Sequence, residues 1–103
     1  MSVFWTNTAE EHLEAIYAYI AKESPVYAKR MVDRLTGRSI QIAEYPLSGR
    51  AVPEYELTQI REVIEGPFRI IYCIKPDGID VLAVIHAAQN TLNERVDNLT
   101  QNV

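Results

Sequence analysis

The segment Phe68–Gln89, FRIIYCIKPDGIDVLAVIHAAQ, predicts the centre of the fold. Two runs rich in β-branched and aromatic residues flank Pro76-Asp77-Gly78, a turn sequence that is typical of a β-hairpin. A hairpin with one face in water alternates apolar and polar residues, whereas both halves here are almost wholly apolar. We therefore expect the strands Phe68–Lys75 and Ile79–Ile85 to lie in the middle of a sheet that is covered on both faces.

Two further strands are predicted on the N-terminal side of this hairpin. Ile60–Glu65 has the composition of a strand, and Gly66-Pro67 forms the turn that joins it to the hairpin. Residues 2–5, SVFW, predict a short strand, and residues 46–56 predict a loop because they contain two prolines and a glycine. With the helices described next, the expected class is α+β, and a chain of 103 residues suits one domain.

Capping patterns mark the start of two predicted helices. Thr8 with Glu11 has the form of a capping box, so we expect Thr8 to cap a first helix over about residues 9–22. Ser24-Pro25 predicts the start of a second helix, which ends before Pro46 because proline disfavours helix in the residue before it. The connection between the helices is short, so they are expected to pack as an antiparallel hairpin.

The lengths of the turns predict how the strands pair. A three-residue loop at Pro76–Gly78 pairs Lys75 with Ile79, which places Tyr72 opposite Leu82. A one-residue change in this register would move every side chain of a strand to the other face. The further pairs in this register are Cys73 with Val81, Phe68 with His86, Glu65 with Phe68, and Arg61 with Tyr72.

This register divides the polar residues of the strands between two apolar faces. Arg61, Tyr72 and His86 fall on one face, while Glu62 and Arg69 fall on the other. We expect Tyr72 to be mostly buried because it lies in mid-strand. Arg69 is either a functional residue or the partner of Glu62 in a pair that fixes geometry. The apolar neighbours are Val63, Ile70, Leu82 and Val84 on the first face, and Ile64, Ile71, Val81 and Ile85 on the second.

One helical hairpin covers only one face of a sheet, so the second face needs another cover. Leu92, Val96 and Leu99 predict a short C-terminal helix that would cover part of it. We expect a partner chain to cover the rest, because a large exposed apolar face marks an interaction site.

Composition and charge restrict the class of protein. Ten lysines and arginines stand against fourteen acidic residues, and the net charge of −4 disfavours general affinity for a phosphate backbone. The only cysteine, Cys73, excludes an internal disulfide and a cysteine-built metal site. No segment approaches the length of a membrane span, so we expect a soluble cytoplasmic protein with no metal and no cofactor.

A basic stripe is predicted on the second helix. Arg30, Arg34 and Arg38 are spaced four residues apart and would line one side of that helix. The stripe is either a solvated helix face or a docking strip for an acidic partner.

The order of these elements resembles the ParE/RelE superfamily, the small toxins of bacterial type II toxin–antitoxin modules. The resemblance covers nearly the whole chain and rests on the order and spacing of several short motifs. It implies a toxin that a cognate antitoxin neutralises. The motifs are Ala9, the helix start from Ser24-Pro25 to Ala28, Pro46–Arg50 (PLSGR), Arg61-Glu62, Phe68–Tyr72 (FRIIY) and Val84–His86.

The resemblance implies two alternative activities. RelE-like toxins cut messenger RNA on the ribosome with basic residues on the sheet, and only Arg69 of that set has a counterpart here. Ile60 and Glu62 stand where lysines fall in those toxins, and Gln89 stands near the place of an arginine. Other ribonucleases of the superfamily use a histidine and a glutamate. If this chain is a ribonuclease, the expected catalytic residues are therefore His86, Glu62 and Arg69.

ParE-like toxins instead bind DNA gyrase and trap it on cleaved DNA, which requires a binding surface rather than an acid–base pair. The acidic net charge and the missing lysines favour this branch, so we expect a binding inhibitor rather than an enzyme. Its implied partners are a ParD-like antitoxin and DNA gyrase, without sequence-specific nucleic-acid binding by the toxin itself. The expected partner-binding residues are Arg30, Arg34, Arg38, Arg61, Arg69, Tyr72 and His86.

A third interpretation is an inactive member that only binds its antitoxin. ParE-like toxins commonly end the last strand with His-x-x-Arg-Asp, whereas residues 86–90 here are HAAQN. Two charged positions of the motif are therefore amides in this chain.

Overall fold

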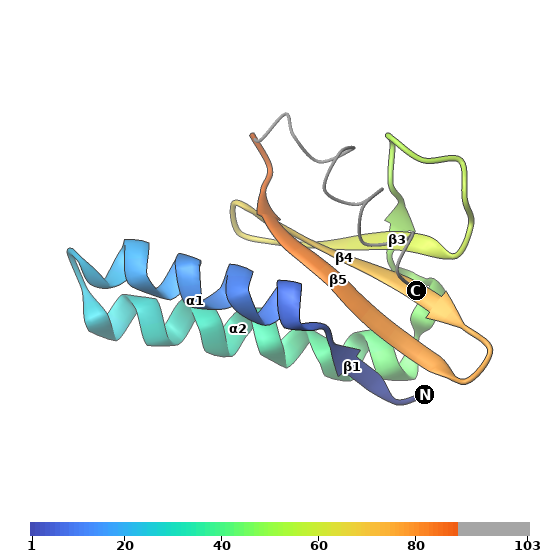
Figure 1. Cartoon of the computed structure of the whole chain (residues 1–103), viewed down its shortest axis with the longest axis horizontal. Helices are drawn as coiled ribbons and strands as arrows, with labels where there is room; N and C mark the ends of the chain where they lie inside the picture. The colour runs from blue at the N-terminus through green and yellow to red at the C-terminus, as the bar shows by residue number, and fades with distance from the viewer. Residues whose placement is uncertain (89–103) are drawn as a thin grey trace.

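A five-stranded sheet and a two-helix hairpin make up residues 1–88, the part of the chain that the computed structural model describes (Figure 1). The strands lie in the order β1-β5-β4-β3-β2, and β1 is parallel to β5 while the other neighbours are antiparallel. The expected α+β class is confirmed. The elements are β1 Val3–Trp5, α1 Asn7–Ala21, α2 Pro25–Glu44, a 3₁₀ turn η1 Pro46–Ser48, β2 Arg50–Ala51, β3 Ile60–Glu65, β4 Phe68–Lys75 and β5 Gly78–His86.

The helix starts follow their capping residues, with one correction. Ser24 caps α2 as predicted, because its hydroxyl accepts a hydrogen bond from the amide of Tyr27 at 3.1 Å. Helix α1 is capped by Thr6 rather than Thr8, and the Thr6 hydroxyl accepts from the Ala9 amide at 3.2 Å. The same hydroxyl donates to the carbonyl of Val81 at 2.8 Å. This contact with β5 favours Thr6 as the cap, and no local pattern reveals it.

The register of the central hairpin differs from the prediction near the turn and agrees with it at the far end. Lys75 pairs with Gly78, so the loop has two residues instead of three. A bulge between Ile71 and Tyr72 then leaves Leu82 without a partner, and Tyr72 faces Val81. The bulge offsets the shorter loop. The pairs Phe68 with His86, Glu65 with Phe68, and Arg61 with Tyr72 are therefore as predicted, whereas Cys73 faces Asp80 instead of Val81.

The bulge exchanges the faces of two residues. Val81 packs in the cluster between sheet and helices, and Leu82 packs on the opposite face, each the reverse of the prediction. The cluster under the helices joins helix residues to one face of the sheet: Ala9, Met31, Leu35, Ile42, Val63, Phe68, Ile70, Tyr72, Ile79, Val81 and Val84.

Much of the second face of the sheet, for which we expected a C-terminal helix and a partner chain as cover, is buried within the chain. Ile71, Leu82 and Ala83 are fully buried there, and Val52 from the loop after β2 is buried with them. Tyr55 from the same loop is half-buried against this cluster. The sequence predicted a loop here but gave no sign that it folds back over the sheet. The C-terminal helix predicted around Leu92–Leu99 lies outside the described residues.

Side chains from the two helices form hydrogen bonds with backbone groups at the edges of the sheet. His12 of α1 accepts a hydrogen bond from the Val84 amide through Nδ1 at 3.1 Å, beyond the point where β1 stops pairing with β5. Arg38 of α2 donates to the carbonyl of Ile64 in β3 at 2.8 Å. Such contacts hinder the pairing of foreign strands with a sheet edge. None of the helices in residues 1–88 has the length and apolarity of a membrane span.

Candidate functional site

A buried charge network links the second face of the sheet to the loop that covers it. Glu62 of β3 has a fully buried side chain, and Arg69 of β4 is nearly as buried. Arg69 Nε donates to Glu62 at 2.6 Å, and its two terminal nitrogens each donate to Glu54 at 2.9 Å. Arg50 of β2 donates to the second oxygen of Glu62 at 2.6 Å. The network therefore runs Arg50, Glu62, Arg69, Glu54. Glu62 accepts from both arginines, one at each oxygen, and both oxygens of Glu54 accept from Arg69.

Strand register brings most of this network together. Arg50 pairs directly with Glu62 in the β2–β3 ladder, so their side chains share a face. Arg69 pairs with Ile64 in the β3–β4 ladder, and Ile64 lies two residues after Glu62. Residues two apart in a strand share a face, so Arg69 lies on the face that carries Glu62. The predicted Glu62–Arg69 pair is present. Glu54 comes from the irregular loop, and the sequence pattern did not point to it.

The pair between Arg69 and Glu54 favours the ionised form of both groups. The bidentate hydrogen bond to Glu54 raises the pKa of Arg69 above its usual value, against the opposing effect of burial. The hydrogen bond from Arg69 is likewise the largest cause that lowers the pKa of Glu54 below its usual value of 4.5. All the guanidinium nitrogens of Arg69 therefore donate to internal carboxylates, and none is directed at an external phosphate in this structure.

Glu54→Gln is expected to flatten the acid limb of the pH–stability profile. Because the pKa of Glu54 is lowered in the folded chain, its ionised form stabilises the fold above about pH 4.5, and this stabilisation is lost as the pH falls through the folded pKa. Urea titrations between about pH 7 and about pH 3 should show a smaller decline in the variant. Glu56→Gln, at an exposed acid of the same loop, is the control. Equal declines for Glu54→Gln and the native chain would contradict the assignment.

Tyr72 locks the motif Pro46–Arg50 onto the sheet. Its ring is fully buried, as expected, and burial raises the pKa of its hydroxyl. The hydroxyl donates to the Pro46 carbonyl at 2.6 Å and accepts from the Gly49 amide at 3.1 Å. Arg61 donates to the Gly49 carbonyl at 2.9 Å from the other strand. Tyr72 is fully buried in the chain alone, so its expected part in partner binding would be to hold Pro46–Arg50 in place.

Two arginines of the stripe on α2 form ion pairs with the sheet, and the third is exposed. Arg34 and Arg38 both pair with Glu65 of β3, at 2.8 and 3.0 Å. Arg30 is exposed and makes no ion pair with any of residues 1–88. The helical spacing was correct, but two of the three positions tie α2 to the sheet.

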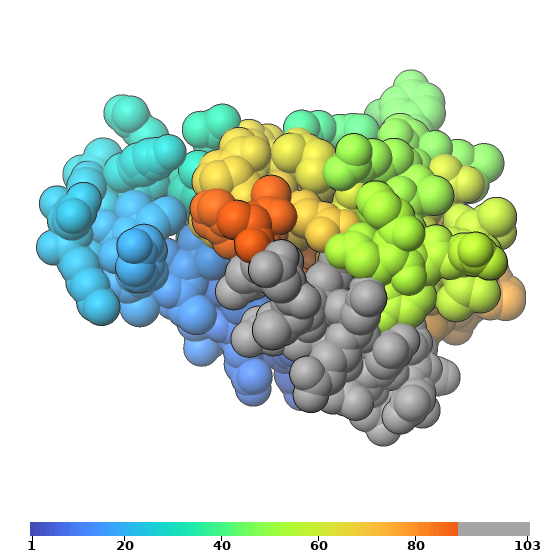
Figure 2. Space-filling view, turned by 90° about the horizontal axis from the view of Figure 1, so that it is seen from above, coloured from blue at the N-terminus to red at the C-terminus, as the bar shows by residue number. Residues whose placement is uncertain are grey.

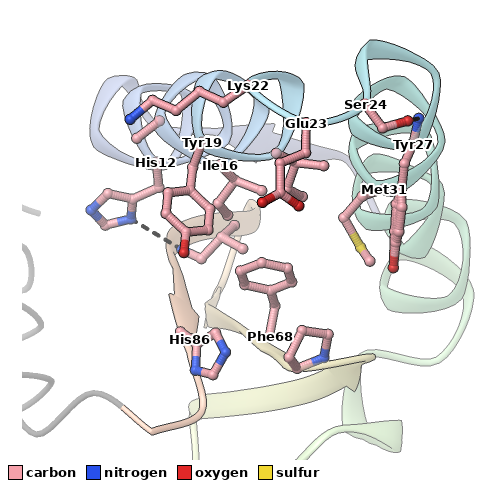
Figure 3. A pocket seen from close by; sticks show the side chains of 14 residues that line it. His12, Ile16, Tyr19, Lys22, Glu23, Ser24, Tyr27, Met31, Phe68 and His86 are labelled. Carbon is pink, nitrogen blue, oxygen red and sulfur yellow. Dashed lines mark hydrogen bonds between the residues drawn. The ribbon is translucent and has the colours of Figure 1, made fainter.

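His86 lies at the rim of a pocket between the helical hairpin and the sheet (Figure 3). The pocket has a volume of about 980 Å³, and the ring of Phe68 points into it from β4. His86 packs against Phe68 edge to face, with ring centroids 5.7 Å apart, and accepts a hydrogen bond from Ala88 through Nδ1. The residues that line the pocket include apolar side chains (Ile16, Ile20, Met31, Phe68, Val84) and polar ones (His12, Tyr19, Lys22, Glu23, Tyr27, His86).

The candidate catalytic set does not come together. His86 pairs with Phe68 and shares its face, which is the face under the helices. Arg69 is the next residue after Phe68 in an extended strand, so its side chain projects to the opposite face, where it meets Glu62. The sheet therefore separates the histidine from the glutamate and the arginine. Within residues 1–88, no group of three or more histidine, cysteine or acidic side chains is placed to hold a metal ion.

Comparison with known proteins identifies relatives along most of the chain. A family model described as the ParE toxin of the type II toxin–antitoxin system parDE matches residues 3–91. A protein named putative toxin Y4kP from Sinorhizobium fredii is 38% identical over 87 residues, which are 82% of this chain and 86% of the relative. A protein named toxin RelE2 from Caulobacter vibrioides is 35% identical over 88 residues, 84% of this chain and 96% of the relative.

Solved structures share the fold. A chain of the chromosomal ParDE toxin–antitoxin system from P. aeruginosa superposes with a TM-score of 0.69 at 26% identity, and the match covers 84% of this chain and 95% of that one. A chain of the toxin–antitoxin complex RelBE2 from Mycobacterium tuberculosis gives a TM-score of 0.59 at 22% identity, with coverage of 82% and 95%. The second likeness concerns the fold alone.

Proposed function

Because the chain belongs to the ParE toxin family of type II toxin–antitoxin systems, we propose that it inhibits DNA gyrase and is neutralised by a cognate ParD-like antitoxin. The proposed site of action is the cytoplasm, where gyrase works. The protein acts by binding, and it needs no acid–base pair of its own.

The separation of the candidate catalytic residues carries this proposal. Cleavage of RNA requires groups that activate the 2′-hydroxyl, stabilise charge on the phosphate and protonate the leaving oxygen at one place. Here Glu62 and Arg69 are saturated by their mutual pair and by Arg50 and Glu54, while His86 lies across the sheet. Ile60 and Glu62 also stand at the two sheet positions where RelE-like toxins carry lysines.

Two assays on one preparation test the proposal. The purified protein is expected to inhibit gyrase supercoiling and to accumulate cleaved DNA, while a ribosome-bound message stays intact. Loss of a single donor aimed at developing charge typically costs about a hundredfold or more in rate, so the absence of positive groups at Ile60, Glu62 and Gln89 leaves little cleavage. Message cleavage that vanishes in His86→Ala, with gyrase unaffected, would overturn the proposal.

The alternative function is a RelE-like ribonuclease, and one observation favours it. The relative named toxin RelE2 is 35% identical over most of both chains, so the family relationship extends to a protein that carries the RelE name. The same pair of assays separates the two functions. Activity in neither assay would instead support an inactive member that only binds its antitoxin.

The antitoxin is the second element of the proposal. The superposed chain at 26% identity comes from a ParDE system, which supports a ParD-like partner for this chain. The residues expected at the interface stay proposed contacts, and three of them, Arg30, Arg34 and His86, are exposed. Co-expression with the product of the adjacent gene should yield one complex in size-exclusion chromatography. A toxin that elutes alone would count against this partner.

A further inference from the structure

The loop of residues 52–57, here called the strap, packs on the apolar second face of the sheet. Val52 is fully buried and Tyr55 half-buried against the cluster of that face. Glu54 lies between these two residues, and its carboxylate accepts hydrogen bonds from both terminal nitrogens of Arg69 at 2.9 Å. In Figure 2 the yellow-green segment of the chain that contains the strap lies on the visible face of the molecule, beside the yellow strands. The ion pair of Glu54 and the packing of Val52 and Tyr55 thus help to hold the strap on the sheet.

The strap is anchored on both sides but is not itself part of the sheet. On its N-terminal side Ala51 pairs with Arg61, and Tyr72 fixes Gly49. On its C-terminal side the Gln59 carbonyl accepts from the Ile74 amide at 2.8 Å. Residues 52–57 belong to no strand, and the amide of Tyr55 donates back to Val52 in a turn within the strap. Movement of the strap therefore requires no strand to break.

Arg69 divides its hydrogen bonds between the sheet and the strap. Its Nε binds Glu62, which belongs to β3 and stays in place whether the strap is closed or open. Its terminal nitrogens bind only Glu54 among the hydrogen bonds of residues 1–88. Lifting the strap would leave the Glu62 pair intact and turn two charged donors toward the uncovered apolar cluster.

We propose that the strap is a displaceable cover, and that Glu54 holds the place of an acidic side chain from a partner. The partner is an extended peptide segment with one carboxylate flanked by apolar or aromatic residues. The chemistry of the strap itself, Val-Pro-Glu-Tyr, shows what this surface accepts, and the two donors of Arg69 match a carboxylate in bidentate geometry. The inference holds whether the toxin acts on gyrase or on the ribosome.

Competition with the strap limits the affinity of such a partner for the native chain. A tethered segment acts at a high effective concentration, so a free peptide of the same chemistry is outcompeted. A partner that also binds elsewhere on the toxin gains a similar advantage and can displace the strap. Weakening the Glu54 contact should open the surface to a free peptide.

Hydrogen exchange followed by mass spectrometry tests the movement of the strap. At neutral pH, Glu54→Gln is expected to speed exchange of the strap amides by about tenfold, the effect of weakening a charge-assisted pair. Exchange in β4 and β5 should be unchanged. Glu56→Gln, at an exposed acid of the strap, is the matched control and should behave as the native chain. Equal strap exchange in both variants, or loss of strap and strand protection together, would overturn the inference.

A peptide supplied in trans tests what the uncovered surface accepts. The probe is the synthetic peptide of residues 51–59, AVPEYELTQ, with AVPQYELTQ as its control. The Glu54→Gln chain should bind the acidic probe at least about tenfold more tightly than the native chain does, because the native strap competes. The same chain should discriminate against the glutamine probe. Equal binding of the two probes, or no gain from Glu54→Gln, would show that Glu54 holds no place for a partner carboxylate.

Discussion

Arg69→Met is expected to lower the free energy of unfolding by about 3–5 kcal/mol, the cost of breaking a buried ion pair from one side. Glu62 has a fully buried side chain, and Arg69 is the partner that shares its buried environment. The remaining partner, Arg50, is mostly exposed, so it compensates the buried charge less well. Urea unfolding followed by circular dichroism should show the loss as a lower midpoint at an unchanged slope.

Two further variants separate the charge effect from lost packing. Arg50→Met removes the exposed partner of the same carboxylate and should cost about 1 kcal/mol or less, because Arg50 is mostly in solvent and Arg69 still pairs with Glu62. The double variant Arg69→Met with Glu62→Leu removes both buried charges and should recover most of the loss. A double variant as unstable as Arg69→Met would show that the arginine stem, rather than its charge, stabilises the sheet.

Tyr72→Ala is expected to destabilise the fold by about 3–5 kcal/mol, as for other large aromatic residues removed from a core. Its ring fills the layer under the helices, where it is fully buried. Its hydroxyl also joins the Pro46 carbonyl to the Gly49 amide. The change therefore leaves a cavity and frees two backbone groups at once. Thermal unfolding measures the effect, and an unchanged melting temperature would contradict it.

Two smaller changes divide the contribution of Tyr72. Tyr72→Phe keeps the ring and should cost about 1–3 kcal/mol, since it leaves the two backbone groups without their partner. Gly49→Ala should also destabilise, because a β-carbon there would meet the Tyr72 hydroxyl and lie 2.8 Å from the Glu62 carbonyl oxygen. Tyr72→Phe in the Gly49→Ala background should relieve part of that strain. Simple additivity of the two changes would argue against direct contact between these positions.

The predictable part of the fold is the part that local patterns control. Strands β3 and β4 have the predicted boundaries, and α2 begins at Pro25 and ends before Pro46, because strand composition, turns and prolines act within a few residues. The two-residue loop before Gly78 and the bulge at Ile71 were missed. A bulge is decided by packing on both sheet faces, and no residue type marks it in the sequence.

The candidate site was predictable only where strands position it. Glu62 and Arg69 were placed on one face by strand alternation, and their pair is present. Glu54 and His12 were not predicted as contacts. Glu54 reaches Arg69 from an irregular loop, and His12 reaches the Val84 amide from a helix 72 positions away in the chain. The sequence predicted that the three arginines share one side of α2. It did not predict that Arg34 and Arg38 pair with Glu65, because that contact depends on the tertiary fold.

The parallel pairing of β1 with β5 has a consequence for synthesis on the ribosome. The hydrogen bond between Thr6 and Val81 joins residues 75 positions apart, and β1 meets only β5 within the described sheet. The contact that ties the capping residue of α1 to the sheet therefore cannot form until β5 has left the exit tunnel. Contacts of such long range slow folding, so the sheet of the nascent toxin stays incomplete until β5 joins β1 to β4. An antitoxin made beforehand would meet the chain before the toxin acquires its active shape.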